Sequence, residues 1–145
     1  MRKITEIIIH CSATPEGRDY TVEDIDLWHR ARGFTGIGYH YVIYRDGSVH
    51  EGRPVDRAGA HCKGHNAHSI GICYIGGCER DGRTPKDTRT PSQTASRSRL
   101  LRHLQSLYPD ATIHCHNEFA PKACPSFGKS QLPKMLNVKM LNQPP

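Results

Sequence analysis

Histidine and cysteine occur in this chain at positions where they could bind a metal ion. The 145 residues include ten histidines and six cysteines. His10 ends one short apolar run, His114 and His116 end another, and Cys124 lies in the loop that follows. Imidazole nitrogen and thiolate sulfur are ligands that zinc prefers, and a catalytic zinc uses three protein ligands and keeps a fourth position open.

Spacing alone leaves open which of these candidates bind a metal. A single histidine at a strand end is more often an ordinary residue than a ligand, and a lone cysteine such as Cys124 is more often a small buried side chain. His114 and His116 are two residues apart on a predicted strand, so both point to one face. Neighbouring strands lie about 4.8 Å apart, so two strand ends can share one ion only if the strands are adjacent.

The elements that must position these residues follow from hydrophobic patterning. Runs of β-branched and aromatic residues predict strands over residues 5–10, 38–44, 48–53, 69–75 and 111–116. Asp46 and Gly47 separate the second and third of these runs and predict a hairpin turn. The polar stretch 79–89 is expected to be an exposed loop.

Two helix starts stand out. Thr21 with Asp24 three residues later predicts a capped helix that ends at Gly33, and its inner face is expected to include Trp28. Thr90, followed by Pro91 and Gln93, predicts a second helix, whose leucines repeat at helical spacing. The resulting order β-α-β-β-β-α-β predicts a single α/β domain in which a central mixed β-sheet is flanked by helices.

Length and composition fit one domain over residues 1–145, with a core over about 5–127 and a tail over 128–145 that holds one short helix. The net charge of +6 attracts polyanions, either nucleic acid or anionic cell-wall polymers. The basic residues are scattered, so no nucleic-acid partner is expected, and a monomer is the default. Neither a signal peptide nor a membrane span is expected. We therefore expect synthesis in the cytoplasm, with all six cysteines reduced.

Five segments of the chain, in order, carry a family resemblance. Together they resemble the zinc-dependent N-acetylmuramoyl-L-alanine amidases of the phage lysozyme type, which are related to peptidoglycan recognition proteins. The similarity runs from about residue 7 to residue 127, and five segments in the same order are a specific signal. The segments are HCSAT after Ile9, GYH at 38–40, GAHCKGHN at 59–66, SIGI at 69–72 and APKACP at 120–125.

The resemblance implies a zinc ion held by His10, His116 and Cys124. His114 has no counterpart in the family's pattern and is left out of the ligand set. The resemblance also implies hydrolysis of the amide bond between N-acetylmuramic acid and L-alanine in bacterial peptidoglycan. Zinc chemistry suits that reaction, because a bound zinc polarises a carbonyl and acidifies water. Such an enzyme acts on the cell wall after release or export by another system.

Four further residues carry roles over from the family. Tyr39 matches an active-site tyrosine and Lys122 an active-site lysine, so both are expected to be catalytic. A phenol is a poor base at neutral pH, so Tyr39 is expected to orient water or the intermediate. His61 and Asn66 lie in a loop that resembles the rim of the family's groove, and we expect them to bind substrate.

Three other interpretations compete with catalysis. A peptidoglycan-binding module without activity would resemble the family but lack the cysteine ligand, whereas Cys124 is present here. A nucleic-acid-binding protein with a structural zinc would need a fourth ligand, for which His114 is the candidate. A secreted protein with three disulfides would need paired cysteines, which a titration of free thiols would exclude.

Overall fold

The computed structural model describes residues 2–128 and shows an α/β domain built on one mixed sheet. The sheet has five strands in the order β4-β3-β5-β1-β7. All neighbouring pairs are parallel except β3 with the edge strand β4. Its strands are β1 (Glu6–Cys11), β3 (Tyr41–Ile43), β4 (Val49–Glu51), β5 (Ser69–Tyr74) and β7 (Thr112–Cys115). The fold class predicted from the sequence is confirmed.

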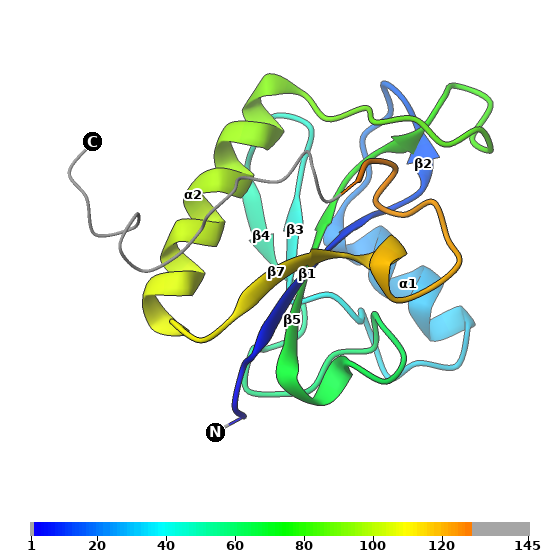
Figure 1. Ribbon diagram of the computed structural model, residues 1–145. Helices are drawn as coiled ribbons and strands as arrows, with labels where there is room; N and C mark the ends of the chain where they lie inside the picture. The colour runs from blue at the N-terminus through cyan, green and yellow to red at the C-terminus, as the bar shows by residue number, and fades with distance from the viewer. Residues whose placement is uncertain (1, 129–145) are drawn as a thin grey trace.

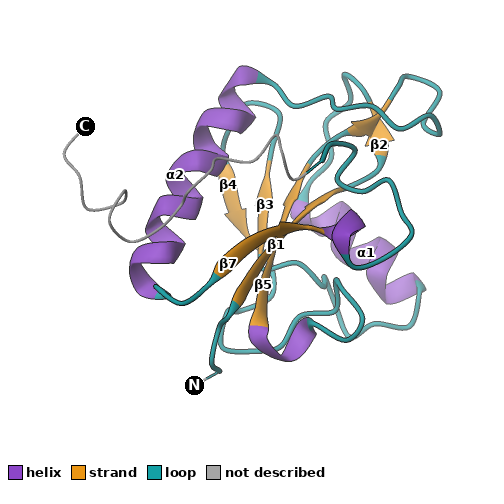
Figure 2. Cartoon of the chain, in the orientation of Figure 1, coloured by secondary structure: helices purple, strands orange, loops and turns teal. Residues whose placement is uncertain are grey.

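The two α-helices cover opposite faces of this sheet (Figures 1 and 2). Helix α2 (Pro91–Leu107) packs Leu101 and Leu104 against a core that includes Ile7 and Ile9 of β1. Helix α1 (Val22–Ala31) packs Ile25 in a smaller cluster on the other face. Because side chains alternate along a strand, Ile8 and His10 of β1 face the other side, toward α1.

Local sequence signals explain where the elements begin and turn. Thr21 and Thr90 cap the two helices, and each accepts a hydrogen bond from the third residue of its helix, as predicted. The Asp46-Gly47 turn joins β3 to the antiparallel strand β4, and Gly47 has a φ of 89°, which a residue with a side chain rarely adopts. The predicted hairpin is therefore confirmed.

Several expectations need correction. The predicted strand 38–44 is a regular strand only over Tyr41–Ile43. The residues before it follow a less regular path: His40 still bonds to Gly71 of β5, but the Gly38 carbonyl accepts from Ala60 of a loop. Trp28 does not belong to the inner face of α1: it is 37% exposed and packs edge-on against Tyr20.

Short elements that the sequence did not suggest complete the chain. Strands β2 (Thr14–Pro15) and β6 (Gly77–Cys78) form a separate two-stranded parallel sheet. There are also two 3₁₀ helices in the described part of the chain: η1 (Asn66–His68) directly precedes β5, and η2 (His116–Glu118) directly follows β7. The short helix expected in the tail lies outside the described residues.

No disulfide joins the six cysteines, all of which lie in the described residues, and five of them are buried. No helix in the part of the chain that the structure describes has the length and apolar character needed to cross a bilayer.

Candidate metal centre and substrate groove

The ends of two adjacent parallel strands place the two candidate imidazoles. His10 is the fifth residue of β1, and His116 follows β7 as the first residue of η2. Since β1 and β7 are paired in parallel, their carboxyl ends meet at one edge of the sheet. The rings of His10 and His116 lie with centroids 4.5 Å apart.

The loop after η2 brings the thiol to the same edge. The backbone N–H of Cys11 donates to Cys124 Sγ at 3.2 Å. The hydroxyl of Tyr74, on β5, donates to the carbonyl of Pro125 at 2.7 Å in a buried bond. These two bonds fix the loop to neighbouring strands, so the position of Cys124 depends on the sheet rather than on the loop alone.

The three side chains form a cluster of the kind that could hold a metal ion. One ligand atom each from His10, His116 and Cys124 lies within 4.8 Å of the others. His10 Nδ1 and Cys124 Sγ are 3.8 Å apart. His116 Nδ1 is buried and has no hydrogen-bond partner among residues 2–128. An unpaired buried nitrogen costs free energy unless something binds it. Two imidazoles, one of which carries this open nitrogen, and a thiol fit a zinc ion.

Burial prepares the imidazoles to bind a cation. It lowers the pKa of His10 well below its usual value, and the neighbouring His61 and His116 lower it further. Burial, followed by the charge of Lys122, also lowers the pKa of His116. Both rings are therefore neutral near pH 7 and keep a lone pair for a metal. The interaction with the Cys11 side chain, followed by burial, raises the pKa of the Cys124 thiol, whereas the bond from the Cys11 backbone N–H lowers it. Because a metal binds the thiolate, this proton must leave when a metal binds.

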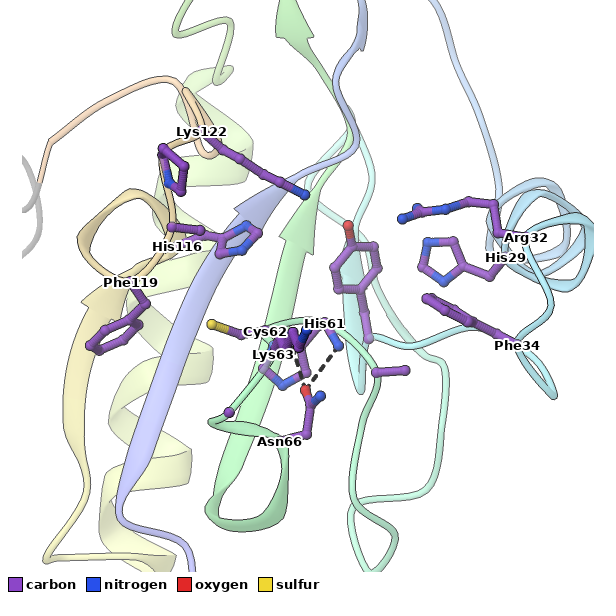
Figure 3. Close-up of a pocket in the computed structure, with 15 residues that line it drawn as sticks. His29, Arg32, Phe34, His61, Cys62, Lys63, Asn66, His116, Phe119 and Lys122 are labelled. Carbon is purple, nitrogen blue, oxygen red and sulfur yellow. Dashed lines mark hydrogen bonds between the residues drawn. The ribbon is translucent and has the colours of Figure 1, made fainter.

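Tyr39 and Lys122 lie beside this cluster. The Tyr39 ring is 5.1 Å from the His10 ring, and burial raises the pKa of its phenol well above 10. Tyr39 is therefore a neutral hydrogen-bond donor at physiological pH. The Lys122 side chain extends over the strand ends into the cavity, opposite Arg32 (Figure 3).

His116, with Tyr39 and Lys122, lines a cavity of about 700 Å³. Its walls come from α1, from the loop before η1 and from the loop after η2. Three cations, Arg32, Lys63 and Lys122, line it together with the aromatic rings of Phe34 and Phe119. Among the described residues that line it there is no aspartate or glutamate. This groove suits a substrate that carries both apolar and anionic groups.

His61 and Asn66 also line the cavity, but their polar atoms are engaged within the chain. The Asn66 Oδ1 accepts from the backbone N–H groups of His61 and Cys62, both at 3.0 Å (Figure 3). The His61 ring bonds to His10 and to Ser69. His61 and Asn66 thus lie where substrate-binding residues would, and their contact with substrate remains a prediction.

His114 lies apart from the cluster. Its ring bonds to Thr112 through Nε2 and to Glu118 through Nδ1, and it contacts the ring of Phe119. The position of His114 therefore does not support a role as the fourth ligand that a structural zinc would require.

Sequence reasoning missed His29, Arg32 and the two phenylalanines of the groove. His29 is buried on α1, and its Nδ1 accepts from the N–H of Gly38, one residue before Tyr39. A signal existed for it, because His29 follows Ile25 by four residues and so shares its inner face.

The fold and the cluster define an α/β domain in which three potential metal ligands lie beside a groove, and mononuclear zinc hydrolases use three protein ligands in this way. The family model described as N-acetylmuramoyl-L-alanine amidase matches residues 1–127. The chain is 41% identical over 126 residues to the endolysin of Enterobacteria phage K11, covering 87% of this chain and 83% of that protein. It is 43% identical over 121 residues to the endolysin of Escherichia phage T7, covering 83% and 80%.

A solved structure of an amidase has a similar fold. N-acetylmuramoyl-L-alanine amidase LysC from Clostridium intestinale URNW is similar with a TM-score of 0.74 and 30% identity, over 86% of this chain and 77% of that one. The chain therefore belongs to the N-acetylmuramoyl-L-alanine amidase family, and the resemblance noted from its motifs is confirmed.

Proposed function

We propose that this chain hydrolyses the amide bond between N-acetylmuramic acid and L-alanine in bacterial peptidoglycan, using a zinc ion held by His10, His116 and Cys124. One observation carries the metal assignment: His10, His116 and Cys124 each place a ligand atom within 4.8 Å of the others, and His116, which lines the groove, has a buried Nδ1 without a partner in the described chain. Membership of an amidase family supports the reaction. Residues 1–145 would then be one catalytic domain.

Bound zinc supplies a Lewis acid that makes an amide carbonyl more electrophilic and water more acidic. The chain itself supplies Lys122, whose ammonium reaches into the cavity. Amide hydrolysis builds negative charge on the carbonyl oxygen, and a fixed cationic donor stabilises that charge. Such a donor contributes about 10²–10³ in rate.

Tyr39 contributes a neutral hydroxyl. Its raised pKa disfavours a role as general base, because the phenolate is the less stable form in this buried position. A neutral phenol donates a hydrogen bond that strengthens as negative charge develops on its acceptor, so we assign Tyr39 the orientation of the attacking water or of the intermediate beside His10.

The groove suits a peptide stem attached to a sugar. Carboxylates of a stem would pair with Arg32, Lys63 or Lys122, and its apolar parts would contact Phe34 and Phe119. Peptidoglycan is accordingly the proposed partner, and the cell wall is the proposed place of action. A monomer suffices for this chemistry, because one chain supplies the whole cluster.

Product analysis tests the proposal. Defined cell-wall fragments that contain the lactyl-alanine bond are incubated with the purified protein, and the masses of the products are measured. The proposal predicts a free sugar and a peptide with a new amino terminus, loss of both products with a chelator, and recovery on addition of zinc. Binding of the fragments without cleavage would instead establish the peptidoglycan-binding module, and cleavage between sugars would exclude an amidase.

A further inference from the structure

The two nitrogens of the His10 ring face different partners. Nδ1 points to the cluster and lies 3.8 Å from Cys124 Sγ. Nε2 lies 2.8 Å from Nδ1 of His61, and the two rings meet edge-on with an interplanar angle of 88°. Since His10 is only 1% exposed, solvent does not compete for either nitrogen.

His61 continues the chain of hydrogen bonds into the sheet. Its Nε2 lies 3.1 Å from the hydroxyl of Ser69, the first residue of β5, and Ser69 is fully buried. A buried line of three groups therefore runs from Ser69 through His61 to His10.

The protons on this line have two consistent arrangements. In one, His61 carries its proton on Nε2 and donates to Ser69, so that His61 Nδ1 accepts from Nε2–H of His10. His10 then presents a bare Nδ1 to the cluster. In the other, every bond is reversed, and His10 carries its proton on Nδ1, where a metal would have to bind. A neutral imidazole has one N–H, so the state of His61 decides that of His10.

Close packing fixes the His61 ring in place. A Cβ added to Gly71, on β5, would lie 2.6 Å from Cγ of His61. A Cβ added to Gly59 would lie 2.6 Å from its Cδ2. The Asn66 side chain also holds the backbone N–H of His61. The ring is therefore held between two positions that have no room for a side chain.

We propose that His61 is a positioning residue of the metal centre: together with Ser69 it holds His10 as the tautomer whose Nδ1 is free to bind the metal. The proposal rests on the assignment of His10 as a ligand in the proposed function. Partners that hold a ligand histidine in this way typically account for about 10–100-fold in metal affinity.

The test measures zinc affinity by competition with a chelator, together with the tautomer of His10 by ¹⁵N NMR of the zinc-free protein near pH 7.5. His61→Leu removes the acceptor and should weaken zinc binding about 10–100-fold. His61→Asn can place an amide oxygen near the position of Nδ1 and should recover much of that loss. His65→Ala is the matched control, since His65 lies in the same loop but bonds to Glu6 instead; it should leave zinc affinity unchanged.

The spectrum separates positioning from general stability. Wild-type protein should show His10 protonated on Nε2, and His61→Leu should show a mixture of both tautomers. If His61→Leu fails to fold, Ser69→Ala is measured in its place. It removes the acceptor of the His61 Nε2–H, so it should also give a mixture of His10 tautomers. A zinc affinity and a His10 tautomer unchanged in these variants would overturn the proposal. Wild-type protein that binds zinc but yields no amidase product would instead contradict the proposed function alone.

Discussion

Protonation of His40 should destabilise the fold as the pH falls below neutral. His40 is fully buried between the sheet and the loop that carries His61. Its Nδ1 accepts from the N–H of Gly71 at 3.0 Å, and its Nε2 donates to the carbonyl of Arg57 at 2.8 Å. A second proton would occupy the Nδ1 lone pair of His40, so the hydrogen bond from the Gly71 N–H would be lost. It would also add a positive charge 3.3 Å from the guanidinium of Arg2.

Burial, with a smaller contribution from the charge of Arg2, lowers the pKa of His40 from 6.5 to about 4. The unfolded chain therefore binds more protons than the folded chain between these two values, so the contribution to stability is complete above pH 6.5 and is lost as the pH falls toward 4. For a folded pKa of about 4 and an unfolded pKa of about 6.5, lowering the pH from about 7.5 to about 5 removes about 2 kcal/mol.

Urea unfolding of wild type and His40→Gln at these two pH values measures this contribution. The variant keeps a donor for the Arg57 carbonyl but cannot titrate, so its free energy of unfolding should fall about 2 kcal/mol less than that of wild type. A chelator in every sample prevents zinc release from adding to the difference, and the other histidines titrate in both proteins. Equal losses in the two proteins would refute the reasoning.

Two further predictions concern the site. Lys122→Ala should lower the hydrolysis rate about 10²–10³-fold, and Tyr39→Phe should also lose most activity, while both keep their metal. Hydrolysis of cell-wall fragments and metal analysis check this, and a wild-type rate in either variant would disprove its assigned role. Tyr74→Phe leaves the buried Pro125 carbonyl without its donor and should cost about 1–3 kcal/mol of stability in urea unfolding. No measurable cost would show that the loop does not depend on this bond.

Local signals predicted the framework of the fold well. The capping pairs at Thr21 and Thr90 and the Asp46-Gly47 turn depend on residues within a few positions of each other, so the sequence specifies them directly. The side of α1 that carries Trp28 was predicted wrongly, because a ten-residue helix with few apolar residues leaves its inner face poorly defined. Buried His29, rather than Trp28, completes that face.

The candidate site depends on contacts between residues that are far apart in the sequence. The motifs identified His10, His116 and Cys124, but only the pairing of β1 with β7 and the bonds to the last loop bring them within 4.8 Å. The bond between His10 and His61 joins residues 51 positions apart. Spacing carries no information about such pairs, so the sequence placed His61 at the groove without indicating its contact with His10.

Metal analysis of wild type and Cys124→Ser tests the central claim most directly. Each protein is purified, checked for folding by circular dichroism, and measured for zinc content and for release of peptide from cell-wall fragments. The zinc assignment predicts about one zinc per wild-type chain and, in the folded variant, loss of both zinc and peptide release. A wild-type protein without tightly bound divalent metal, or a Cys124→Ser protein with full activity, would contradict it.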